Sequence, residues 1–307
     1  MFLHPRDGLI LGKTGPFWFF PSYRMLERTR ATHMLVVGIT GKGKSKLLEA
    51  CAFQDVVHGR GCAIIDPHSD LADDLLRYLV SWRKQNARTT RRFAQLVTPQ
   101  RLVYVNPSRR DWIIPFNVLA SPGDPYTVAQ NVIEAFRRTW PETLREAPHF
   151  TNVMLNSLLV LITHRLTLCE LPRLLLDRDF RQGLLERVED PLVVSFFQER
   201  YDRWRDPALR ESTLNKVTAF TLNPVLRQML GASENRLDFR SFMDRQQVLI
   251  IDLGDCDGET RRLLGSLILV GLENAALSRK GLDPAARPAP VCWPLFRCRV
   301  TSARRST

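Results

Sequence analysis

The sequence predicts an α/β protein, in which a parallel sheet carries helices on its faces and is interrupted by an all-helical insertion. Short apolar runs alternate with helical patterns in the first third of the chain, and this alternation is typical of a parallel sheet. No strand pattern occurs between Asp124 and Leu237, a stretch of more than 100 residues. The strand pattern then returns at Val248–Ile251, so the insertion divides the sheet-forming sequence into two parts.

The elements of the first part follow from short apolar runs and the glycines around them. Buried strands are predicted at Met34–Val37, Cys62–Ile65 and Leu102–Val105. The helices between them are predicted at Lys44–His58 and from Ser69 or Asp70 to Val80. After the returning strand, Thr260–Arg279 has the apolar spacing of a long helix.

Composition excludes several classes of protein. The 307 residues are 44% hydrophobic and 25% charged, which is ordinary for a soluble globular chain. Apolar stretches such as Leu263–Leu272 are shorter than the ~20 residues that span a bilayer, and no secretory leader is expected. The scattered cysteines form no CxxC pair, which favours reduced thiols and a cytoplasmic location. The net charge of +12 suits a polyanionic partner.

The most specific motif is a glycine-rich loop between the first predicted strand and helix. Gly38-Ile39-Thr40-Gly41-Lys42-Gly43-Lys44-Ser45 fits the pattern GxxxxGK[ST] at every fixed position. Glycines allow the backbone N–H groups to turn inward around phosphates, and the helix that follows points its positive end at them. The motif therefore predicts an ATP site formed by residues 38–46, which includes Lys46.

Within this site, two side chains have distinct roles. Lys44 is expected to reach the β- and γ-phosphates, and the Ser45 hydroxyl is expected to coordinate the Mg²⁺ that accompanies ATP. The alternative is a glycine-rich turn that binds no ligand.

Two aspartates end predicted strands and are candidates for an acid near the nucleotide. Asp66 precedes Pro67, so it serves either in the turn before the next helix or beside the nucleotide. Asp252 precedes Leu253, and a solvated strand end is the simpler interpretation there. Neither is followed by the glutamate that would orient an attacking water, so no residue is assigned a catalytic role.

A basic block covers Ser81–Arg110, which contains eight Arg or Lys residues and no acid. It could follow a phosphate backbone, or it could be a solvated connection between a helix and a strand. Its aromatic residues are not spaced as a stacking platform for bases. A non-enzymatic DNA-binding or adaptor module is therefore the alternative function. A GTPase is disfavoured because Asn215-Lys216 is followed by Val217-Thr218 rather than by a guanine-reading motif.

An ordered set of motifs resembles the P-loop ATPases of the HerA/FtsK branch, specifically the TraD/TraG-like coupling proteins of conjugative type IV secretion. The motifs extend from His33 to Pro288 and include the following segments: His33–Gly38, Ile65–Asp70, Val105–Pro107, Phe116–Leu119, Leu174–Asp177, Val248–Leu253 and Leu263–Leu269. The resemblance implies a RecA-like core with an all-helical domain, a hexameric ring, and ATP-driven movement of DNA. It also implies secretion-complex partners, and possible peripheral attachment to the inner membrane through one of them.

With this resemblance, the predicted organisation has four parts. Residues 1–123 form the N-terminal part of the ATPase core, 124–240 the helical insertion, 241–288 the return to the core, and 289–307 an irregular basic tail. The family pattern has a strand ending in Asp-Glu after a dipeptide such as Arg287-Pro288, but this sequence becomes irregular there. The hypothesis is a departure of the reading frame near Ala289, which would leave nucleotide binding intact and hydrolysis weak or absent.

Overall fold

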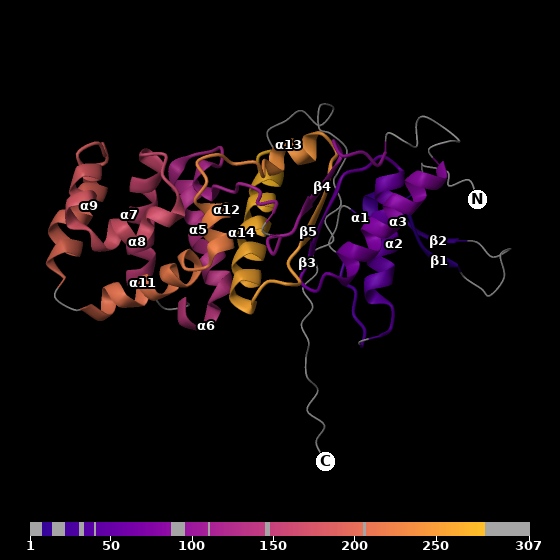
Figure 1. Cartoon of the computed structure of the whole chain (residues 1–307), viewed down its shortest axis with the longest axis horizontal. Coiled ribbons are helices and arrows are strands. Elements are labelled where there is room, and N and C mark those ends of the chain that lie inside the picture. The colour runs from indigo at the N-terminus through magenta and orange to yellow at the C-terminus, as the bar shows by residue number, and fades with distance from the viewer. Residues whose placement is uncertain are drawn as a thin grey trace, which may run out of the picture. The chain divides into compact units, whose positions relative to one another are not determined.

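The computed structural model divides into two compact units (Figure 1). It describes residues 8–13, 22–30, 34–39, 41–86, 96–109, 111–144, 148–204 and 207–279. Among the described residues, the first unit contains those up to Val105 together with Ser241–Asp255, and the second contains Asn106–Arg240 and residues 256–279. The predicted tail, 289–307, lies outside the described residues.

The first unit contains a parallel sheet of three strands (Figure 1). The strands are β3 (Cys62–Asp66), β5 (Val248–Asp252) and β4 (Leu102–Val105), in the spatial order β3-β5-β4. Every residue of β3 and β5 is buried, which explains why both are continuous apolar runs rather than alternating ones. Their register pairs Asp66 with Asp252, so both carboxylates lie at the carboxyl edge of the sheet.

Two helices pack against each other and cover the sheet. They are α2 (Lys44–Val57) and α3 (Asp70–Asn86), which lie side by side in Figure 1. The core that they share with the strands is apolar: Ala52, Val56, Cys62, Ile64, Leu71, Ala72, Leu75, Leu79, Val97, Val248 and Ile250. Because each helix runs back from the carboxyl edge of a parallel sheet, both begin at the edge where Asp66 and Asp252 lie.

An antiparallel pair of strands near the N-terminus was not predicted. Strand β1 (Leu9–Lys13) pairs with β2 (Ser22–Met25), and α1 (Glu27–Arg30) follows. The side chain of Gln54 on α2 accepts a hydrogen bond from the backbone N–H of Ile10 and donates one to its carbonyl oxygen, both at 2.9 Å. This amide takes the place of a neighbouring strand and attaches β1 to α2.

The predicted strand at Met34–Val37 is wrong for the described structure. These residues form no ladder with any described strand, and Leu35 and Val37 are 86% and 81% exposed. The apolar and β-branched residues of this segment favour a strand, but a strand forms in a sheet only where a neighbouring strand can pair with it. The segment leads into the glycine loop without being part of the sheet.

The second unit consists of helices, and the only pairing of β type among its described residues is an isolated bridge between Phe116 and Asn235. Its longer helices are α5 (Pro125–Thr139), α7 (Pro148–Thr163), α9 (Arg178–Leu185), α11 (Pro207–Thr221) and α14 (Gly258–Leu277). Its short helices are α6 (Pro141–Leu144), α8 (Leu171–Leu176), α10 (Pro191–Ser195) and α12 (Pro224–Leu230). Single turns occur at η1 (Val118–Ala120), η2 (Leu168–Glu170), η3 (Phe196–Arg200) and η4 (Tyr201–Arg203), and α13 (Phe239–Asp244) crosses the boundary between the units.

The boundaries of this unit differ from the predicted insertion. It begins at Asn106 rather than at Asp124, and it includes α14, which the sequence assigned to the returning core. The physical reason is that α14 packs along α5 (Figure 1). Leu263, Leu264 and Ile268 of α14 are buried. The expected helical character is confirmed.

Candidate nucleotide-binding loop

The glycine loop has the backbone conformation that its sequence predicts. Gly41 and Gly43 have φ angles of 80° and 81°. These angles lie in the left-handed region, which residues with a Cβ atom rarely adopt. A Cβ atom on either glycine would meet no atom within 4 Å. The space above both residues is therefore open, and their φ angles alone account for the requirement for glycine. Thr40 lies outside the described residues.

The loop leads into the N-terminus of α2, whose donors have no side-chain cap. Gly43 is the N-cap residue, it has no side chain to accept a hydrogen bond, and the first turn of α2 holds no acid. Lys42, Lys44 and Lys46 instead place positive charge at this end. Cations near a helix N-terminus oppose the helix dipole and cost stability, whereas an anion bound there restores it. The arrangement suits an anionic ligand.

Lys44 lies over the loop rather than away from it. Its Nζ donates a hydrogen bond to the carbonyl oxygen of Ile39 at 3.0 Å, and a Cβ atom on Gly38 would lie 3.6 Å from its Cγ. The ammonium group is thus held beside the loop backbone by one exposed hydrogen bond, which a phosphate oxygen could replace. The neighbouring Ser45 is exposed, so its hydroxyl is open to a ligand.

Lys46, which the motif included in the predicted site, has other partners. Its Nζ donates to Asp74 Oδ2 at 2.5 Å and to Glu49 Oε2 at 2.8 Å. The hydrogen bond to Asp74 and then that to Glu49 raise the pKa of Lys46, and the same lysine lowers the pKa of Asp74. Because Lys46 is in the first turn of α2 and Asp74 is near the start of α3, this pair joins the two helices at their N-termini.

Asp66 caps the start of α3. Its Oδ2 accepts hydrogen bonds from the backbone N–H groups of Leu71 at 2.9 Å and Ala72 at 3.0 Å, while its Oδ1 accepts one from His68 N at 3.0 Å. The side chain is buried, with 4% of the residue exposed. These contacts correspond to the turn-and-cap role that the sequence allowed. The carboxylate accepts a hydrogen bond from each of these three backbone N–H groups.

Asp252 is the centre of a small network that the sequence did not reveal. Its Oδ1 accepts hydrogen bonds from Ser69 Oγ at 2.6 Å and Gly254 N at 3.1 Å, and its Oδ2 accepts one from Tyr104 OH at 2.8 Å. Asp252 is buried rather than solvated, so the solvated strand end is wrong. Ser69 has a φ angle of 67°, and its bond to Asp252 holds that turn in place. The network joins the carboxyl ends of all three strands.

One basic residue of the Ser81–Arg110 block has a structural role. The guanidinium of Arg101 donates to the carbonyl oxygens of Leu96 (2.7 Å), Val56 (3.0 Å), Gln246 (3.1 Å) and Arg60 (2.5 Å). Desolvation by burial lowers its pKa. Arg101 therefore ties together the segments at the amino edge of the sheet and does not present its charge to a partner. Arg83 and Lys84, on the last turn of α3, are exposed.

Within the described ranges, no helix has the length and apolar character to cross a bilayer. The same part of the chain has no cluster of three or more His, Cys, Asp or Glu side chains placed to hold a metal ion.

Comparison with known proteins identifies the fold. No protein-family model and no curated protein matches the sequence. Among solved structures, the bacterial conjugative coupling protein TrwBdeltaN70, in its unbound monoclinic form, matches 78% of this chain with a TM-score of 0.51 and 18% sequence identity. In fold, the chain is similar to a conjugative coupling protein. This similarity confirms the expected RecA-like α/β fold with its helical domain. The chain spans 50% of the length of the TrwB chain.

Proposed function

We propose that the chain binds ATP with Mg²⁺ at residues 38–45 and acts in conjugative DNA transfer as a coupling ATPase. The observation that carries this proposal is the uncapped N-terminus of α2, which follows two left-handed glycines and holds Lys44 over the loop. The similarity in fold to TrwB supports the biological setting.

The residues of the loop fit this ligand. Backbone N–H groups around Gly41 and Gly43 would hold the phosphates, Lys44 would pair with the β- and γ-phosphates, and Ser45 would hold the Mg²⁺. When bound, Mg²⁺ supplies charge neutralisation at the phosphate oxygens. Lys46 keeps Asp74 and Glu49 as partners, and so contributes its charge to the site rather than a direct contact.

Hydrolysis by this chain alone is proposed to be slow. The two strand-end carboxylates, Asp66 and Asp252, are buried and each accepts three hydrogen bonds from the protein. Neither has the free, exposed oxygen that a base for an attacking water needs. The absence of a general base typically lowers a rate by ~10²–10⁴, so binding and turnover are separable.

A titration with a fluorescent ATP analogue tests the proposal. Lys44→Ala removes a charge-assisted hydrogen bond, worth ~1.5–3 kcal/mol, and we expect binding to weaken by about 10- to 150-fold. Lys84→Ala removes the same charge from an exposed position on α3 and serves as the matched control. Equal affinities of the two variants would refute the assignment of the loop.

DNA and further copies of the chain are the proposed partners, and the cytoplasm is the proposed location. The net charge of +12 and the exposed Arg83 and Lys84 support an electrostatic contribution to DNA binding. DNA binding should then weaken steeply with salt. If it does so without any response to nucleotide or to Lys44→Ala, the chain acts as the non-enzymatic DNA-binding or adaptor module.

A further inference from the structure

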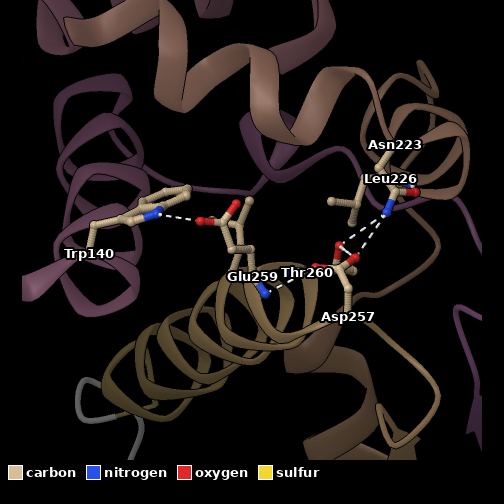
Figure 2. A pocket seen from close by; sticks show the side chains of 7 residues that line it. Trp140, Asn223, Leu226, Asp257, Glu259 and Thr260 are labelled. Carbon is tan, nitrogen blue, oxygen red and sulfur yellow. Dashed lines mark hydrogen bonds between the residues drawn. The ribbon is translucent and has the colours of Figure 1, made fainter.

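A pocket in the second unit is separate from the glycine loop and its chemistry. Its volume is about 200 Å³, and it opens between the C-terminal end of α5, the start of α12 and the first turn of α14 (Figure 2). Its lining is part acidic, part aromatic and part apolar: Trp140, Asn223, Leu226, Asp257, Glu259, Thr260 and Leu263. Pockets for drug-sized ligands measure ~300–1,000 Å³, so this one suits a single side chain rather than a nucleotide.

Asp257 is fully used by the protein. Its Oδ1 caps α14 by accepting from the backbone N–H groups of Glu259 at 3.0 Å and Thr260 at 2.9 Å. Its Oδ2 accepts from Thr260 Oγ1 at 2.5 Å and Asn223 Nδ2 at 3.4 Å. The N–H groups of Glu259 and Thr260 at this helix end are therefore occupied, and the carboxylate itself repels an anion.

Glu259 is the acid that remains available. Its Oε1 accepts a hydrogen bond from Trp140 Nε1 at 3.4 Å, and Figure 2 shows the two side chains facing each other across the pocket. Among the described residues, no hydrogen bond or ion pair engages its second oxygen, Oε2. The residue is exposed, so this oxygen can receive a donor from outside.

We propose that this pocket binds the guanidinium group of an arginine side chain presented by another polypeptide. A planar guanidinium can stack on the Trp140 indole and pair with the Glu259 carboxylate at the same time. Leu226 and Leu263, each 1% exposed, form the apolar floor of the pocket. A lysine ammonium has neither the flat face nor the paired donors, so it binds more weakly.

The experiment uses the full chain labelled with 5-fluorotryptophan and observed by ¹⁹F NMR. The Trp140 resonance is assigned by its loss in Trp140→Phe. The probes are N-acetyl-arginine amide, N-acetyl-lysine amide and N-acetyl-citrulline amide, which has the shape of the arginine derivative but no charge. We expect a saturable shift of the Trp140 resonance with the arginine derivative, a weaker response with lysine, and none with citrulline. Free arginine should bind less tightly than its amide, because its own carboxylate meets the acidic lining.

Glu259→Gln should weaken arginine binding by about tenfold or more, the effect of losing a hydrogen bond to a charged group. Glu142→Gln is the matched control, because Glu142 is exposed on the neighbouring α6 and does not line the pocket. Circular dichroism without ligand verifies that each variant is folded. The proposal is overturned if citrulline binds as well as arginine, if Trp140 does not respond to arginine, or if both glutamate variants have the same effect.

Discussion

Replacing Gly43 by alanine tests the loop conformation directly. Gly43 has a φ angle of 81°, and a Cβ atom there would meet nothing within 4 Å. The substitution therefore adds no steric clash, and its effect is that of the left-handed conformation alone, roughly 1–2 kcal/mol for a residue with a side chain. We expect Gly43→Ala to lower the free energy of unfolding by about this amount.

The matched control is the same substitution in a helix. Gly183 lies within α9, and a Cβ atom there also meets nothing within 4 Å. Since helical glycine is less stable than alanine by roughly 0.5–1 kcal/mol, Gly183→Ala should raise stability by about that amount.

Urea unfolding, followed by circular dichroism, measures both variants against the wild-type chain. We expect Gly43→Ala and Gly183→Ala to change the free energy of unfolding with opposite signs, although both replace a glycine by alanine in open surroundings. A neutral or stabilising Gly43→Ala would refute this expectation, because the loop would then not hold a left-handed residue at this position.

Two further changes affect stability. Arg101→Met removes the donor that four partly buried carbonyl oxygens share. The Val56 oxygen keeps a hydrogen bond from Gly59 N, and at ~1–3 kcal/mol for each of the three others we expect a loss above about 3 kcal/mol in urea unfolding. A loss below about 1 kcal/mol would contradict the structural role. For Asp257, partial burial alone would raise the pKa, but hydrogen bonds from the Thr260 hydroxyl and from the Thr260 and Glu259 N–H groups lower it below its ordinary value. Its contribution to stability is therefore present above the ordinary pKa of ~3.9 and is lost as the pH falls through the lowered value. In unfolding measured between pH 6 and pH 2, roughly the range in which carboxylates titrate, Asp257→Asn should flatten this loss, and an unchanged pH profile would count against the cap.

The sequence predicts most of the first unit because its signals are local. The apolar runs at Cys62–Ile65, Leu102–Val105 and Val248–Ile251 all became strands of one sheet, since a strand buried on both faces needs no polar positions. The positive φ angles of Gly41 and Gly43 follow from the glycine loop in the same way.

Features that depend on partners distant in the sequence were not predictable. Met34–Val37 has the composition of a strand, but the described residues provide no neighbour for it. Arg101 looks like part of a basic surface until the four carbonyl oxygens around it are known. The burial of Asp252 likewise depends on Ser69 and Tyr104, which are 183 and 148 residues away in the sequence.

The stability of the chain as a function of ATP concentration, with Mg²⁺ in excess, is the most direct test of the nucleotide site. A ligand that binds only the folded state stabilises it by ~2.7 kcal/mol when its concentration is 100 times the dissociation constant. We expect a thermal midpoint that rises steadily with ATP in the wild-type chain, and in Lys44→Ala the same rise only at ATP concentrations about 10- to 150-fold higher. A wild-type midpoint that does not move at millimolar ATP would contradict this expectation.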